Sequence, residues 1–278
     1  MRWSTVCAVL SLSMLSLLPD VTAQDSIFPD KALEAVVRTY VFEKRNNDMP
    51  IVEADVVNIS TIKGKNKGIT DLTGLEKCRA LLSLDLEGNE ITKVDAIAGL
   101  TGIQSLDLTK NKITDLKPIE GLKKLQYVKL TNNQIVDLSV VSKLDNLRVL
   151  DVSNNQVQDL VPVAGLKKLH SLYAAGNKIT DITPLASLSR LDSLDLGGNQ
   201  VADLSPLKEF ERWKFLILEN NKIADLGVLV EAAKAANAKP DRSASFWQVF
   251  LSGNPLSDEA KGPQFEELKK QTKLVEFK

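Results

Sequence analysis

The sequence has few of the residue types that carry out chemistry. Its 278 residues include one histidine and two cysteines, and aromatic residues make up 5%. A single histidine excludes a His-Glu-x-x-His zinc site, and Cys7 and Cys78 form no Cys-x-x-Cys pair. No Gly-x-Ser-x-Gly elbow accompanies His170, and residues 64–68 lack the spacing of a phosphate-binding loop. Paired carboxylates are plentiful, so the residue composition does not exclude a two-carboxylate glycosidase. We nevertheless expect no catalytic residues, no metal site and no cofactor.

An excess of charge is also missing. The sequence has 35 Lys and Arg residues against 36 Asp and Glu residues, a net charge of −1. Non-specific nucleic-acid binding requires a basic surface that displaces counterions from the phosphates. The charge balance therefore disfavours nucleic acid as a partner.

Only one long apolar run is present, and it lies at the N-terminus. Residues 6–18 follow the basic Arg2, and small residues occupy positions 21–23. We predict that residues 1–23 are a signal peptide, with an uncleaved anchor or a buried helix as the alternatives. No later run is long enough for a membrane span, so we expect a secreted or periplasmic protein. Cleavage would leave Cys78 as the only cysteine, which we expect to be a buried hydrophobe rather than a reactive thiol.

Leucine, by contrast, is abundant, with 42 residues, and its spacing indicates repetition. Asparagine recurs every 22 residues from Asn89 to Asn221, and again at Asn254. Leu-x-Leu precedes most of these asparagines, and such alternation places two side chains on the same side of a short strand. The apolar intervals of three that follow suit a tight turn on the opposite side. One unit cannot bury its leucines alone, so we predict a stacked solenoid with a parallel sheet of eight strands.

Two polar columns accompany the repeat. We predict that the asparagines are structural, because one amide can satisfy backbone groups of its own loop and of the neighbouring loop. The second column follows one turn later, and it is expected to form Asx-type turns rather than a calcium spine. Its members are Asp115, Asp137, Asp159, Asp181, Asp203 and Asp225.

The repeated segments resemble those of a known family. Two examples are Asn111-Lys-Ile-Thr-Asp-Leu-Lys-Pro-Ile119 and Asn177-Lys-Ile-Thr-Asp-Ile-Thr-Pro-Leu185. The pattern resembles the leucine-rich repeat family, and its 22-residue form resembles bacterial internalin-type repeats. The resemblance implies an α/β solenoid of horseshoe shape. A parallel β-sheet would line the concave face, short helical or 3-10 turns the convex face, and helices would cap both ends. The pattern also resembles intracellular phosphatase-binding repeat proteins, but the signal peptide argues against that setting.

The pattern divides the chain into segments after the signal peptide. We expect an N-terminal helical cap at 24–66, with a helix over 27–42, and leucine-rich repeats at 67–229. A helical insertion at 230–245 precedes the last repeat and C-terminal cap at 246–278, where a closing helix is expected over 259–272. Phe246 is assigned to the core of the last repeat, while Trp247 is assigned to the outward column.

The register turns the residues between the buried leucines outward on the sheet, the usual binding face of a solenoid. Tyrosine and arginine are favoured as interface anchors. We predict a partner-binding cluster formed by Tyr127, Lys129, Arg148, Asp151, His170, Tyr173 and Asp195. Acids outnumber Lys129 on this face, which would suit a basic partner and repel anionic polymers. Phe215, Ile217, Trp247 and Phe250 form an apolar end that is either exposed or covered by the C-terminal segment.

The function predicted from these observations is recognition of a protein by a secreted, non-catalytic repeat protein. We expect a monomer with no nucleic-acid partner and no membrane span. Two alternatives stay open: a carbohydrate-binding or polysaccharide-modifying protein, and a structural envelope protein that uses the solenoid as a spacer.

Overall fold

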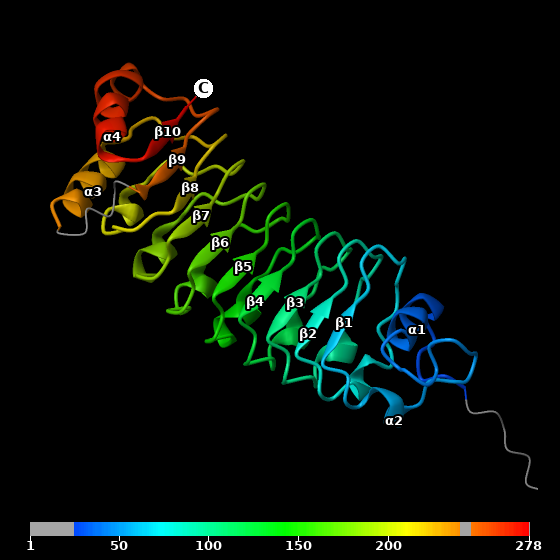
Figure 1. Cartoon of the computed structure of the whole chain (residues 1–278). Coiled ribbons are helices and arrows are strands. Elements are labelled where there is room, and N and C mark those ends of the chain that lie inside the picture. Colours follow the sequence, from blue (N-terminus) through cyan, green and yellow to red (C-terminus); the bar gives the residue numbers. More distant parts are fainter. Residues whose placement is uncertain (1–24, 240–245, 278) are drawn as a thin grey trace, which may run out of the picture.

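A ten-stranded parallel sheet runs the length of the computed structural model, which describes residues 25–239 and 246–277 (Figure 1). The strands follow one another in chain order, and each has three residues. They are β1 (Thr61–Lys63), β2 (Ser83–Asp85), β3 (Ser105–Asp107), β4 (Tyr127–Lys129), β5 (Val149–Asp151), β6 (Ser171–Tyr173), β7 (Ser193–Asp195), β8 (Phe215–Ile217), β9 (Gln248–Phe250) and β10 (Leu274–Glu276). The predicted signal peptide lies outside the described residues. Within them, no helix has the length and apolar character needed to cross a membrane.

The strands form because their side chains alternate between core and surface. Leu106 and Leu108 are buried, while Ser105 and Asp107, which flank Leu106, are half-buried on the outer face. Equivalent residues stand side by side in the sheet, as Leu84 pairs with Leu106 and Leu106 with Val128. Stacking therefore buries one continuous aliphatic column, as the repeat predicted.

Short 3-10 turns return the chain on the side opposite the sheet. They are η1 (Leu75–Lys77), η2 (Asp95–Ile97), η3 (Lys117–Ile119), η4 (Ser139–Lys143), η5 (Val161–Val163), η6 (Thr183–Ser187) and η7 (Ser205–Leu207). Five of the six predicted aspartates stand before such a turn, and Asp225 stands before the helix that begins at Gly227. The Asp115 carboxylate accepts the Lys117 N–H at 2.7 Å, and Asp181 accepts that of Thr183 at 2.8 Å. This bonding confirms the predicted Asx-type role of the column.

The asparagine column joins successive loops. The Asn155 amide donates to the carbonyls of Leu130 and Val152 at 3.0 and 2.9 Å, and its oxygen accepts the Ile135 N–H at 3.0 Å. The residue before Asn155, Asn154, has a φ of 53°, in the left-handed region where Asn and Gly are favoured. The predicted structural role is confirmed, since each such amide satisfies buried backbone groups of two repeats.

Two helices and β1 close the N-terminal end. Helix α1 (Lys31–Arg38) is shorter than the predicted 27–42, and α2 (Glu53–Val56) follows it. The Asp30 carboxylate caps α1, as it accepts the N–H groups of Ala32 and Leu33 at 2.9 Å. The Tyr40 hydroxyl accepts the N–H of Lys63 in β1 at 2.9 Å, so it occupies part of the sheet edge.

At the other end the chain leaves the repeat through α3 (Gly227–Asn237) and closes with α4 (Phe265–Gln271), which a π-turn (Ala260–Gln264) precedes. The two helices lie side by side (Figure 1), and the Asn237 amide donates to the Gln271 carbonyl at 2.7 Å. The closing helix was predicted over 259–272, whereas β10 was not predicted. The sheet thus extends the predicted eight strands by β1 and β10.

Candidate binding surface on the sheet face

The structure places five of the seven predicted partner-binding residues on four adjacent strands of one face, and the other two directly before two of these strands. Tyr127 and Lys129 lie on β4, Asp151 on β5, Tyr173 on β6 and Asp195 on β7. Lys129 pairs with Asp151, Asp151 with Tyr173 and Tyr173 with Asp195, so these four form one continuous row across the sheet.

The two remaining residues stand directly before β5 and β6. The His170 N–H donates to the Arg148 carbonyl at 2.8 Å, which extends the backbone ladder by one residue. Tyr127 is 45% exposed, and Lys129 and Arg148 are also exposed. Asp151, His170, Tyr173 and Asp195 are half-buried. The arrangement offers exposed anchors on a continuous surface, and the contact of these residues with a partner stays a prediction.

Asp195 has an unusual environment within this row. Burial raises the pKa of its carboxyl, and the neighbouring charges of Asp151 and Glu219 raise it further. The Gly197 N–H, which donates to Asp195 at 2.9 Å, acts in the opposite direction. A cation placed beside Asp195 would relieve this repulsion.

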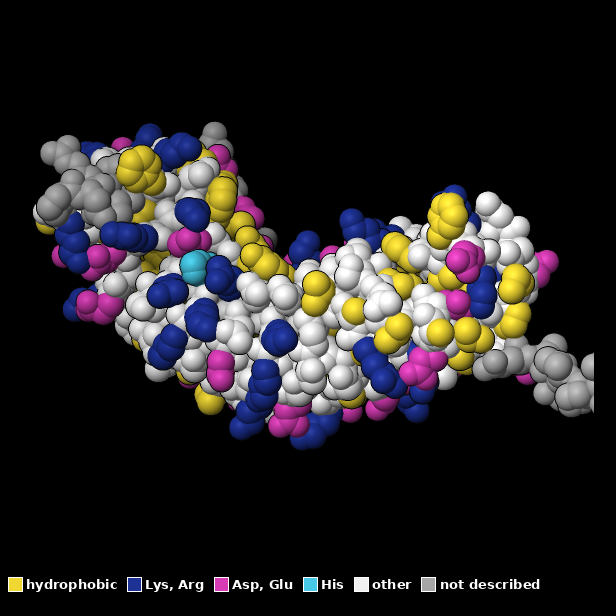
Figure 2. All heavy atoms as spheres, turned by 60° about the horizontal axis from the view of Figure 1, so that its bottom comes forward, with side chains coloured by type: hydrophobic (Ala, Val, Ile, Leu, Met, Phe, Trp, Pro, Cys, Tyr) yellow, Lys and Arg dark blue, Asp and Glu magenta, His cyan; other side chains and the backbone are white. Residues whose placement is uncertain are grey.

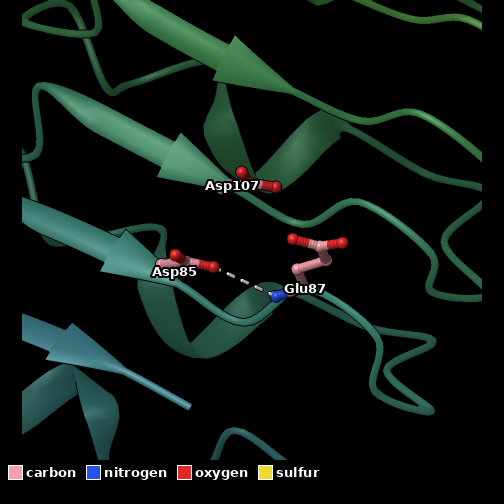
Figure 3. A group of neighbouring side chains, drawn as sticks. All are labelled: Asp85, Glu87 and Asp107. Atoms are coloured by element: carbon pink, nitrogen blue, oxygen red, sulfur yellow. Dashed lines mark hydrogen bonds between the residues drawn. The ribbon is translucent and has the colours of Figure 1, made fainter. Parts of the chain in front are cut away.

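Three carboxylates at the N-terminal part of the face lie close enough together to hold a cation. Asp85, Glu87 and Asp107 have oxygens within 4.8 Å of one another (Figure 3). However, the Lys65 ammonium lies 2.8 Å from Glu87 and 3.3 Å from Asp85. Lys129 lies 3.8 Å from Asp107.

These contacts make the three acids part of an ion-pair network rather than a cation site. A further lysine, Lys110, lies 3.6 Å from Glu87. The hydrogen bond from Lys65 is the main cause that lowers the pKa of Glu87. Three ammonium groups therefore compensate the negative charge that would attract a metal ion.

The apolar end of the face differs from the prediction at two neighbouring residues. Trp247, expected outside, is fully buried, and its indole N–H donates to the Glu211 carbonyl at 3.2 Å. Phe246, expected in the core, is 67% exposed. The assignment is wrong by one residue here because the 22-residue spacing breaks before β9, and the indole finds both burial and a hydrogen-bond acceptor inside.

The other three residues of this apolar end remain on the sheet face. Phe215 is 43% exposed, while Ile217 and Phe250 are half-buried. Ile217 pairs with Asp195 on one side and Phe250 on the other. The apolar end is thus continuous with the row that contains Tyr173, and the described C-terminal segment leaves Phe215 exposed.

Known proteins share the repeat sequence and the fold of this chain. Residues 101–143 and 145–187 match the family model "Leucine Rich repeats (2 copies)", and residues 77–98 match "Leucine Rich repeat". Internalin C2 of Listeria monocytogenes is 41% identical; the match covers 65% of this chain and 89% of that chain, with a TM-score of 0.55. No match to a curated protein is found.

Two further solved structures share the architecture. The functional domain of InlJ from Listeria monocytogenes is 25% identical over 87% of this chain, with a TM-score of 0.65, and this chain spans 56% of it. That domain includes a cysteine ladder, for which a chain with two cysteines has no counterpart. A leucine-rich-repeat protein of Leptospira interrogans, 24% identical over 73% of this chain and 56% of that one, has a TM-score of 0.57 and supports the fold alone.

Proposed function

The chain belongs to the internalin-like leucine-rich-repeat proteins, and we propose that it binds a protein partner through the concave face of its sheet. The observation that carries the proposal is the row on β4–β7. There, the half-buried Tyr173 lies in register with Lys129, Asp151 and Asp195, and the exposed Tyr127 precedes Lys129 by two residues on β4. Tyrosine supplies large contact area with few rotatable bonds, which makes it a favoured interface anchor.

The mechanism is recognition by a preformed surface. Backbone ladders and the asparagine column hold every strand of the row, so binding orders few additional groups. Tyr127 and Tyr173 act as the aromatic anchors. Lys129, Arg148 and His170 provide donors at the border of the anchors.

The acids of the row select the partner by charge. Asp151 and Asp195 are half-buried and close enough for Asp151 to raise the pKa of Asp195. A lysine or arginine of the partner placed between them would compensate both charges. The partner is therefore a protein with a basic contact region.

The setting of the interaction is outside the cytoplasm. Residues 1–23 act as the signal peptide, on the support of their apolar run and small terminal residues. The chain acts as a monomer, because α1 and Tyr40 pack at β1 and α4 packs against β10. Determination of the N-terminal residue of the exported protein tests the first point, and sedimentation equilibrium tests the second.

The binding proposal is tested with matched double variants. A partner is first identified by crosslinking the purified protein in secreted or envelope extract, and its affinity is then measured by calorimetry. Tyr127→Ala with Tyr173→Ala should weaken binding at least about tenfold, since truncated aromatic anchors commonly cost more than 1 kcal/mol each. The control is Val136→Ala with Val161→Ala, which removes exposed apolar side chains away from the sheet.

The control should bind like the wild type, with both doubles showing wild-type circular dichroism. A folded tyrosine double with unchanged affinity would place the interface elsewhere. Equal loss in both doubles would show that exposed apolar area in general, rather than the sheet row, drives the capture.

A further inference from the structure

The edge of the solenoid that precedes the strands carries a concentration of positive charge. It comes from the loops that lead into β4–β7, and all its members are exposed. This basic edge consists of Lys123, Lys124, Lys143, Arg148, Lys167, Lys168 and Arg190. Figure 2 views this side of the molecule, and dark blue side chains gather there around the histidine.

The positive charge of the basic edge is largely uncompensated. Within the described part of the chain, none of its seven residues forms a salt bridge, although Lys65 and Lys129 on the sheet face do. The same loops hold three acids. Glu120 pairs with Lys117 at 2.7 Å and also interacts with Lys123 and Lys143, Asp192 pairs with Lys214 at 2.8 Å, and Asp145 is exposed. The seven cations outnumber these acids. The near-neutral total charge of the protein therefore conceals a local basic surface.

Contacts between neighbouring repeats order part of this surface. The Lys123 ammonium donates to the Lys143 carbonyl at 3.1 Å, and Lys168 donates to the Asn146 side chain at 2.6 Å. The backbone ladder that includes the Arg148 N–H fixes the loops at the strand spacing of about 4.8 Å. Cations thus recur on successive loops along the solenoid axis, interleaved with amides such as those of Gln126 and Asn146.

We infer that the basic edge is a second binding surface, and that its ligand is an anionic polysaccharide bearing carboxylate or sulfate groups. A line of cations that extends over four successive loops matches a polymer with charges along its length better than it matches a compact ligand. Lysine and arginine donate to the oxygens of such groups. The interleaved amides supply hydrogen bonds for sugar hydroxyls.

The neighbouring surfaces restrict the kind of anion that binds. The exposed large apolar residues among those described include none from the loops at 120–124, 142–148, 164–170 and 186–192, so nothing there inserts into a bilayer. Asp151 and Asp195 on the adjoining sheet face repel a wide polyanion such as duplex nucleic acid. A narrow chain can follow the edge without crossing these acids.

The test uses heparin and polygalacturonate as sulfated and carboxylated probes, with neutral dextran as the blank. The variant is Lys124→Gln, Lys168→Gln and Arg190→Gln, which changes three equivalent loop positions. The control, Lys93→Gln, Lys178→Gln and Lys222→Gln, removes the same charge from exposed residues that follow the strands. Affinities are measured by calorimetry at several salt concentrations, together with circular dichroism.

We expect the wild type to bind at least one anionic probe and not dextran. The loop variant should lose tenfold or more in affinity, with a salt dependence of log K shallower by about 2. The control variant should keep wild-type affinity. The double tyrosine variant Tyr127→Ala with Tyr173→Ala should also keep it, which separates this inference from the proposed protein interface.

Three results would overturn the inference. The first is that neither anionic probe binds. The second is that the two triple variants lose affinity equally, which would show that net charge alone matters. The third is that the wild type prefers another anion at equal salt. The last is measured with duplex DNA, a poly-glutamate peptide and vesicles that contain phosphatidylglycerol, each of which would assign the edge to a different class of ligand.

Discussion

The position of Asp195 is set by the strand register, and its environment makes it a candidate for contact with a partner. Its position in the strand turns it outward, yet its carboxyl is half-buried between Tyr173 and Ile217. Burial and the charges of Asp151 and Glu219 raise its pKa. A carboxylate that is destabilised in the free protein is a candidate for contact, because a partner's cation would stabilise it.

The raised pKa predicts a pH-dependent effect of Asp195→Asn. The folded state holds the proton more tightly than the unfolded state, so ionised Asp195 costs stability once the pH rises through its folded pKa. Asp195→Asn should therefore be more stable than the wild type at pH 7. The advantage should shrink as the pH falls from the folded pKa toward the ordinary value of 3.8 and be absent below it, where both states are protonated. Urea unfolding at pH 7, 5 and 3.5 measures this; an advantage that grows toward acid pH would contradict the assignment.

At the scale of elements, the N-terminal cap is joined to the repeats by one side chain. While one oxygen of Asp30 caps α1, the other accepts the N–H of Thr70 at 2.8 Å, its hydroxyl at 3.0 Å and the N–H of Asp71 at 3.0 Å. Burial alone would raise the pKa of Asp30, but these donors outweigh it and lower the pKa. The ionised carboxylate thus stabilises the docked cap.

We predict that Asp30→Ala lowers the free energy of unfolding by about 2–3 kcal/mol, since it removes a helix cap and the hydrogen bonds to a second segment. Because the pKa of Asp30 is lowered on folding, its contribution should be present at neutral pH and be lost as the pH falls through the folded value. Chemical denaturation of the variant measures the change, with the exposed Asp48→Ala as the control. If Asp30→Ala and Asp48→Ala unfold alike, the cap does not depend on this bridge.

The elements also differ in how far the sequence predicted them. The predicted helix over 27–42 contains α1, and the Leu-x-Leu spacing predicted β2–β8 in register. Strands β1 and β10 were not predicted, because the Leu-x-Leu pair is absent there: Gly64 and Phe277 stand two residues after Ile62 and Val275. The end of α1 was predicted too late, since Tyr40 and Val41 continue the apolar pattern beyond the last helical turn.

For the whole molecule, the consequence of stacking is that each repeat contacts its neighbours and little else. Strand order follows chain order throughout, so a terminal repeat has one neighbour and an inner repeat has two. In such a solenoid, stability is approximately the sum of repeat and interface contributions. The ends should therefore open more readily than the centre.

We predict that amides of β4–β6 exchange with solvent at least about tenfold more slowly than those of β1 and β10, because end repeats open without unfolding the centre. Native-state hydrogen exchange followed by mass spectrometry measures this difference. Equal protection along all strands would instead indicate a single cooperative unit, in which the caps hold both ends as firmly as the interior.

The sequence by itself determined the repeat, its register and the direction of the residues in β2–β9. These follow from periodicities of 2 and 22 residues that act within and between adjacent units. The tertiary structure decided two further matters: the exchange of Phe246 and Trp247, and the pairing of Asp85 and Glu87 with Lys65. Each depends on side chains that meet across repeats or after an insertion. Their positions are set by packing and charge between segments far apart in the chain, and local spacing does not contain that information.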